Sequence, residues 1–187
     1  MIGNIAAGLY GVGVTPSTSS FESIATISVG AGGASNIEFT SIGSGYKHLQ
    51  IRGIYRQSDS DSAPYINLTF NNDTGSNYAA HALTGTGSAA IAQAYTSAPA
   101  MYVQTVASDF HGTSVFSGLV IDVLDYGSTS KNKTTRSLVG IDNNGGGFIR
   151  FNSGLWMSTS AVTSIKFTPS GGSIKQYSTL ALYGIKD

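Results

Sequence analysis

Apolar and polar side chains alternate along several stretches of this chain. Leu49 and Ile51 share one face of residues 46–57, and mostly polar residues occupy the positions between and beside them. Residues 64–71 and 161–168 repeat this alternation. A period of two predicts strands that have one buried face and one solvated face.

Three other stretches carry apolar side chains on both faces. They are Val115–Leu124, Phe148–Trp156 and Tyr177–Ile185. Such stretches are typical of central strands that are covered on both sides. The second cover can come from the same chain or from a neighbouring subunit, so these segments are also candidates for subunit contacts.

Turn-forming residues separate the predicted strands. Glycine-rich clusters at residues 30–33 and 170–172 supply backbone conformations with positive φ. Residues 84–100, which are mostly small, are predicted to form a long surface loop with a helical turn at residues 89–94. About nine to eleven strands at this spacing predict an all-β fold, an antiparallel β-sandwich of jelly-roll type over residues 21–187. A barrel is the alternative.

An apolar segment precedes the predicted sandwich. Residues 1–20 are expected to form an extended N-terminal docking arm that ends in a Ser/Thr linker. The arm can fold back on its own core or dock on another subunit, because exposed apolar side chains need a covering surface. Its candidate contact residues are Ile2, Ile5, Leu9, Tyr10, Val12 and Val14.

Charge and composition exclude several functional classes. Lys and Arg total 10 and Asp and Glu total 10, so the net charge is +0 and we expect no nucleic-acid partner. No stretch approaches the roughly 18 apolar residues of a membrane span, so we expect no membrane partner. The absence of cysteine excludes thiolate metal sites. A neutral chain with only 11% charged residues suits a subunit that is held in an assembly.

Residues that could perform chemistry form no recognisable active site. The chain has no phosphate-binding glycine loop and no nucleophile elbow. His48, His81 and His111 lack metal-ligand spacing, and His48 is expected on a solvated strand face. We therefore expect no enzymatic activity and no cofactor.

Two pairs of carboxylates invite a chemical interpretation. Asp59 and Asp61 could supply two oxygen ligands to calcium, but they lie in a serine-rich turn that lacks a third acidic ligand. Asp122 and Asp125 could act as the acid pair of a glycosidase, but they occupy the polar end of a predicted strand. A solvated turn and a strand end are the better interpretations.

Two aromatic residues are the candidates for a contact or glycan-binding surface. They are Trp156, the only tryptophan, and Tyr126. Packing in the core or between subunits is the leading interpretation of Trp156, and a sugar platform is the alternative. Loops rich in Ser and Asn together with surface Tyr favour a protein that makes adaptable contacts.

Several segments, taken in order, carry a resemblance to a known family. They are Val29–Ala34, Ile37–Ile42, Tyr46–Arg52, Phe70–Tyr78, Ser153–Trp156 and Gln176–Ile185. Together they resemble small β-sandwich proteins encoded by tailed bacteriophages, including cyanophages, over about residues 24 to 185. The opening Ile2–Tyr10 is similar to the short docking arm of some phage structural proteins.

The resemblance implies a virion component without enzymatic activity, on the exterior of the particle and made in the host cytoplasm. Its partners would be the major capsid protein, for a head decoration or cement subunit, or baseplate and tail proteins, for a tail fibre. Head decoration ranks first, because no coiled-coil heptads of a fibre shaft are visible. The resemblance and the apolar strand faces together predict a homotrimer. A receptor-binding protein that recognises a host glycan is the alternative.

Overall fold

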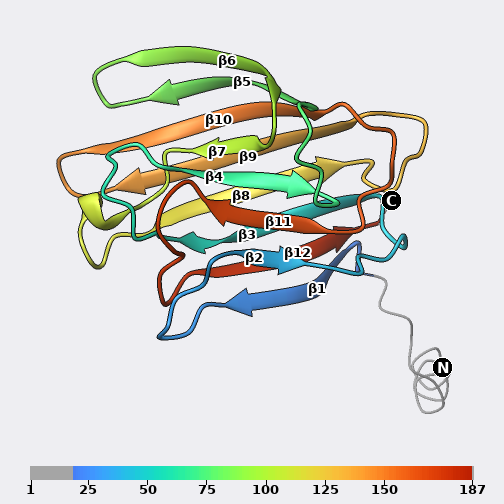
Figure 1. The fold of residues 1–187 in the computed structure, drawn as a ribbon, viewed down its shortest axis with the longest axis horizontal. Coiled ribbons are helices and arrows are strands. Elements are labelled where there is room, and N and C mark those ends of the chain that lie inside the picture. The colour runs from blue at the N-terminus through green and yellow to red at the C-terminus, as the bar shows by residue number, and fades with distance from the viewer. Residues whose placement is uncertain (1–18, 187) are drawn as a thin grey trace, which may run out of the picture.

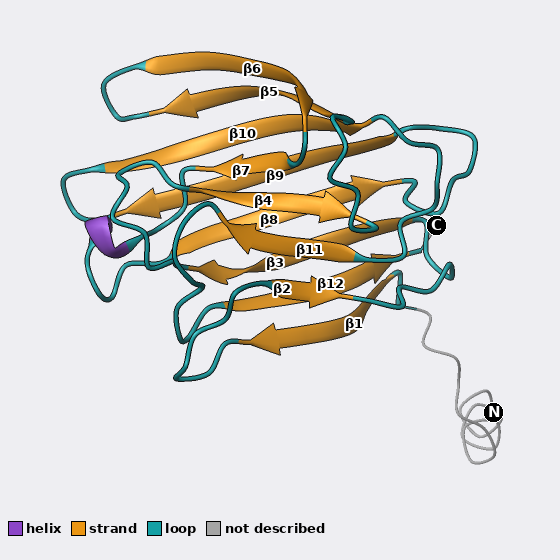
Figure 2. Cartoon of the chain, in the orientation of Figure 1, coloured by secondary structure: helices purple, strands orange, loops and turns teal. Residues whose placement is uncertain are grey.

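The computed structural model describes residues 19–186 of the chain, which fold as a β-sandwich (Figure 1). Strands dominate, and the single helical element is one short 3₁₀ turn in these residues (Figure 2). In chain order the elements are β1 (Phe21–Ser28), β2 (Ile37–Phe39), β3 (His48–Tyr55), β4 (Tyr65–Phe70), β5 (Tyr78–Gly85), β6 (Ala90–Ala98), β7 (Met101–Gln104), η1 (Asp109–His111), β8 (Ser117–Leu124), β9 (Lys133–Asp142), β10 (Gly147–Trp156), β11 (Ile165–Pro169) and β12 (Thr179–Ile185).

The strands form two antiparallel sheets. The larger sheet has 8 strands in the order β1-β12-β3-β8-β9-β10-β5-β6, and the smaller has 4 in the order β2-β11-β4-β7. The first five strands alternate between the two sheets, so the chain wraps around the core in the manner of a jelly roll. The predicted antiparallel sandwich is confirmed, and the barrel is not. The predicted N-terminal arm lies outside the described residues.

The hydrophobic core lies between the two sheets. Leu49 and Ile51 of β3 and Ile66 and Leu68 of β4 are fully buried in it, as the alternation of their segments predicted. Burial of such side chains removes apolar surface from water and is the main favourable contribution to folding. The smaller sheet covers the larger one from β12 to β10, where its edge strand β7 lies over β9 and β10, and Figure 1 shows that the β5–β6 hairpin extends past this edge.

The loop and helical turn expected within residues 84–100 are wrong. This segment contains β6, which pairs with β5 from Gly85↔Ala90 to Tyr78↔Ala98. Alanine has little intrinsic preference for strands, so the composition of β6 gave no strand signal. Backbone hydrogen bonds to β5 determine its conformation instead, and β6 becomes one edge of the larger sheet.

Candidate functional site

The larger sheet has one covered face and one open face. The inner face packs against the smaller sheet, and we call the opposite face the outer face. Because residues 19–186 place no sheet against the outer face, the side chains on this face are available to another molecule or segment.

Large apolar side chains lie side by side on the outer face. Leu83 of β5 pairs with Phe151 of β10, Phe151 pairs with Leu138 of β9, and Leu138 pairs with Val120 of β8. Directly paired residues of neighbouring strands lie about 5 Å apart and contact one another. Phe151 is 58% exposed and Leu83 is 55% exposed. We call these four residues the apolar row.

A second line of residues extends the apolar surface. Ile149 of β10 pairs with Gly85 and Gly140, and Gly118 lies between Gly140 and the exposed Ile54 of β3. The glycines have no side chains, so they leave a depression between the two isoleucines. At the start of β10 this line opens into a groove of about 670 Å³ that is lined largely by glycine.

The outer face carries no net charge. On the other side of the apolar row, Arg136 Nη2 lies 3.1 Å from Asp122 Oδ2, and Gln50 Nε2 donates to Asp122 Oδ1 at 2.7 Å. The remaining charged side chains at outward strand positions are Arg52 and Asp142, which also balance. This face would neither repel a second copy of itself nor attract a strongly charged partner.

The inner face of β10 is polar where the outer face is apolar. Arg150 is 2% exposed and donates from Nε to Asn152 Oδ1 at 3.2 Å and from Nη1 to Thr84 Oγ1 at 2.8 Å. Nη1 also donates to Gln93 Oε1. Burial lowers the pKa of Arg150, and none of its hydrogen bonds within residues 19–186 is to a carboxylate. Burial of a cation costs free energy, which the hydrogen bonds of Arg150 offset in part. At this point of β10 the polar side chains therefore face inward and the apolar ones face outward.

Trp156 and Tyr126 do not form the predicted contact or glycan surface. They are 2% and 1% exposed, because both point into the core between the sheets. Trp156 Nε1 donates to Asp73 Oδ2 at 2.7 Å, and its ring packs 5.5 Å from that of Phe70. The leading interpretation of Trp156 as a core residue is confirmed. Tyr126 donates its hydroxyl to the carbonyl of Gly43.

The candidate carboxylates are engaged in local hydrogen bonds and ion pairs. Asp59 Oδ1 accepts from the backbone N–H of Asp61 at 3.0 Å, which is the pattern of a side-chain-capped turn. Asp125 accepts from Lys131 and lies 3.3 Å from Lys47 Nζ. These contacts lower the pKa of Asp125, and the hydrogen bond from Lys131 is the largest cause. Asp125 is therefore a surface ion-pair residue.

The histidines are dispersed. Among residues 19–186, no group of three or more His, Asp or Glu side chains is placed to hold a metal ion. His48 Nδ1 accepts from the backbone N–H of Asp125 at 2.9 Å. His81 lies on the outer face, two positions from Leu83 on β5.

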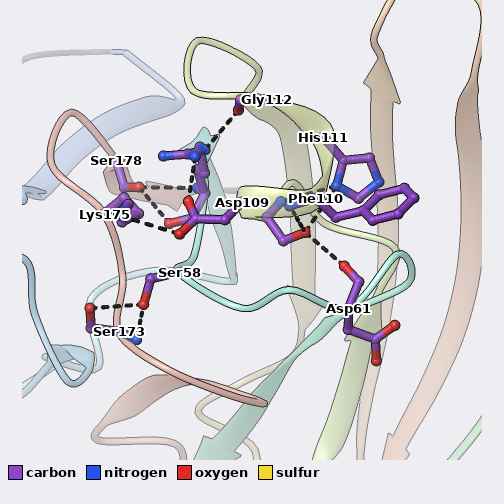
Figure 3. Close-up of polar contacts among 11 residues, drawn as sticks. Ser58, Asp61, Asp109, Phe110, His111, Gly112, Ser173, Lys175 and Ser178 are labelled. Carbon is purple, nitrogen blue, oxygen red and sulfur yellow. Dashed lines mark hydrogen bonds and ion pairs between the residues drawn. The ribbon is translucent and has the colours of Figure 1, made fainter.

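A Ser–His pair occurs at η1, where the sequence gave no catalytic signal. Ser108 Oγ lies 3.1 Å from His111 Nδ1, which is the distance of a nucleophile and its base. Figure 3 shows His111 beside Phe110, with the backbone of Asp61 close to them. Ser108 is fully buried and donates to the carbonyl of Asp61 at 2.7 Å, while burial lowers the pKa of His111 and keeps the ring neutral. The pair caps the 3₁₀ turn and offers no accessible nucleophile.

The sequence identified part of the outer face and missed the rest. Phe148–Trp156 was predicted to contact the same chain or a neighbouring subunit, and Phe151 and Ile149 do lie on an open face. Leu83 and Leu138 were missed, because only the pairing of β5 and β9 with β10 brings them beside Phe151. The predicted contact residues of the arm lie outside the described residues; they are Ile2, Ile5, Leu9, Tyr10, Val12 and Val14.

Comparisons with known proteins add little beyond the fold. No protein-family model matches the chain, and no curated protein sequence matches it. A solved structure of the galectin LEC-6 from Caenorhabditis elegans is similar to 87% of this chain and 96% of its own, with 11% identity and a TM-score of 0.31. Within residues 19–186, no helix has the length and apolar character that crossing a membrane requires.

Proposed function

We propose that this chain is a non-catalytic structural subunit that assembles with copies of itself through the outer face, as part of the exterior of a phage particle. The observation that carries the assembly is the apolar row, in which two large side chains are more than half exposed. Contiguous apolar patches of this kind mark protein contacts on soluble proteins. The phage setting rests on the sequence resemblance, which also supplies the partners: the major capsid protein, or baseplate and tail proteins.

A second copy of this chain is the occupant that the outer face fits best. Its charges balance within the face, so two copies meet without repulsion and a charged partner gains nothing from the field. The chain as a whole is also neutral. Burial of Phe151 and Leu83 against a partner would contribute about 25 cal/mol for each Å² removed from water. A trimer is the assembly that the resemblance predicts.

Sedimentation of the full chain tests the assembly. We expect the protein to form an oligomer at micromolar concentration and the double variant Leu83→Ser/Phe151→Ser to sediment as a folded monomer. His81→Ser is the matched control, because His81 lies on the same face of the same strand outside the apolar row. A monomeric wild type, or an oligomer that survives the double substitution, would contradict the proposal.

The phage setting has a test of its own. An antibody raised against the chain should label the surface of particles purified from cells that produce it, with labelled heads for a decoration subunit and labelled tails for a fibre. A tail fibre or receptor-binding protein is the second candidate, and a polar pocket at one end of the sandwich, lined in part by Arg56, Lys175 and Tyr177, favours it. Particles that bind no antibody would overturn both locations.

A further inference from the structure

A polar pocket of about 280 Å³ lies at one end of the sandwich, away from the apolar row. The turn after β1, the segment before β12, the segment after η1 and Arg56, which follows β3, supply its lining. Residues that line it include Gly32, Arg56, Thr113, Ser173, Lys175 and Tyr177. Ligand pockets commonly measure about 300–1,000 Å³, so this one suits a single ring.

Two cations line the pocket and no carboxylate does. They are Arg56 and Lys175. Asp109 stands behind them, where its carboxylate accepts from Arg56 Nη2 and lies 3.6 Å from Lys175 Nζ (Figure 3). One carboxylate against two cations leaves the cluster with an excess of one positive charge, which favours an anionic ligand.

Arg56 is fixed in place before any ligand arrives. The residue is 5% exposed, and its Nε donates to the carbonyl of Gly112 at 3.1 Å. Ser178 holds its backbone, since Ser178 Oγ accepts from Arg56 N at 3.1 Å. Nε and Nη2 of Arg56 make the hydrogen bonds to Gly112 and Asp109, and Nη1 makes none to any residue from Ser19 to Lys186. The N–H groups of Nη1 can therefore donate to a ligand.

Tyr177 places an aromatic ring at the pocket without packing it against the protein. Its backbone has φ 73°, in the left-handed region that is strained for a residue with a side chain. Hydrogen bonds enforce this conformation, because Tyr177 N donates to Val29 O at 3.1 Å and Val29 N donates to Ser178 O at 2.9 Å. The ring is 68% exposed. Strained residues of this kind concentrate at ligand-binding positions.

Neutral hydrogen-bonding groups complete the lining. Thr113, Ser173 and Gln176 contribute hydroxyl and amide groups. The backbone N–H of Gly32 makes no hydrogen bond within the described chain, and open space lies around its α-carbon. A phosphate could accept hydrogen bonds from the cations and from these donors, but it has no ring face to pack against Tyr177 and no ring hydroxyls to pair with the neutral groups.

We propose that this pocket binds a sugar that carries a carboxylate, as one unit of an acidic glycan. Arg56 and Lys175 bind the carboxylate, and the ring of Tyr177 packs against the face of the sugar. The neutral groups exchange hydrogen bonds with the hydroxyls of the sugar. This inference is independent of assembly through the outer face, because none of the lining residues belongs to the apolar row.

Titration of the full chain with soluble sugars, followed by NMR shifts of the protein, tests the proposal. We expect glucuronate or N-acetylneuraminate to bind at least about tenfold more tightly than glucose, since a charge-assisted hydrogen bond separates them. Inorganic phosphate lacks the ring and the hydroxyls, so it should bind more weakly than either acidic sugar. Failure of both acidic sugars, or phosphate binding as tight as theirs, would overturn the proposal.

Two variants separate recognition from folding. Tyr177→Gly removes the ring at a position where glycine relieves strain, so it should fold normally and lose most of the affinity. Lys175→Met should abolish the preference for the acidic sugar over glucose. Lys131→Met is the matched control, because Lys131 is an exposed lysine paired with Asp125 outside this pocket. Wild-type affinity in both pocket variants would contradict the assignment.

Discussion

Strands β3 and β10 are both central strands of the larger sheet, and their side chains are distributed in opposite ways. On β3, Leu49 and Ile51 face the smaller sheet and Arg52 faces outward. On β10, Arg150 faces inward and Phe151 faces outward. The backbone ladder runs from one strand to the other through β8 and β9 without a register shift, so the difference lies in the side chains alone.

The reversal divides the sandwich into two kinds of surface. Around β3 the smaller sheet covers apolar side chains, so the chain stabilises this part by itself. Around β10 the inward side chains form a hydrogen-bonded polar cluster, and the large apolar ones meet water. A strand that hides its polar side and exposes its apolar side is suited to a second cover on the outside, which the proposed assembly provides.

The largest expected difference is between truncation of an inward side chain of β3 and truncation of an outward side chain of β10. Ile51→Ala removes a fully buried side chain and should lower the free energy of unfolding by about 2–5 kcal/mol. Phe151→Ala should change the stability of the monomer by no more than about 0.5 kcal/mol, since its side chain is mostly exposed. Urea denaturation, at protein concentrations low enough to keep the chain monomeric, measures both changes in the free energy of unfolding. Equal losses would mean that β10 is not reversed.

The buried arginine of β10 should give an intermediate effect. Arg150→Lys replaces a fork that reaches three side chains with a single ammonium group, which leaves buried acceptors on Asn152 and Thr84 without a donor. We expect the free energy of unfolding to fall by about 1–3 kcal/mol. Arg136→Lys on the exposed outer face is the control and should change little. A stable Arg150→Lys protein would show that the polar cluster contributes nothing.

The sequence predicted the fold class because its strongest signals are local. Alternation in β3 and β4 identified the buried residues Leu49, Ile51, Ile66 and Leu68 correctly. The segment of β10 carries apolar residues on both faces, although Ile149 and Phe151 share one face and Arg150 and Asn152 the other. A period of two shows only that the two faces differ; it does not say which one points inward. That choice depends on where the smaller sheet ends.

The candidate sites depend on contacts between distant segments, which explains why they were missed. Leu83 and Phe151 come from strands that are far apart in the chain and adjacent in the sheet. The cations at the end pocket, Arg56 and Lys175, likewise come from segments that are far apart in the chain. A sugar platform was the alternative interpretation of Trp156, and its burial agrees with the leading one, packing in the core. The exposed ring at the pocket belongs to Tyr177.

The smallest predicted effect concerns the end of β10, where the inward side becomes aromatic again at Trp156. Asp73 accepts from Trp156 Nε1 at 2.7 Å, from Asn77 Nδ2 at 2.9 Å and from Gly75 N at 2.8 Å. The hydrogen bond from Trp156 is the largest cause of a pKa for Asp73 below its ordinary value of 3.8.

A lowered pKa means that the carboxylate stabilises the fold fully at neutral pH. This contribution is lost as the pH falls below about 4 and through the pKa of the folded state. Unfolding in urea, followed by the fluorescence of Trp156 between about pH 5 and pH 3, should therefore show a falling stability. Asp73→Asn keeps an oxygen acceptor for the indole and removes the charge, so its stability should fall less steeply over the same range. Identical slopes would show that the carboxylate does not hold Trp156, and the inward position of Trp156 would then depend on packing against Phe70 and Tyr78.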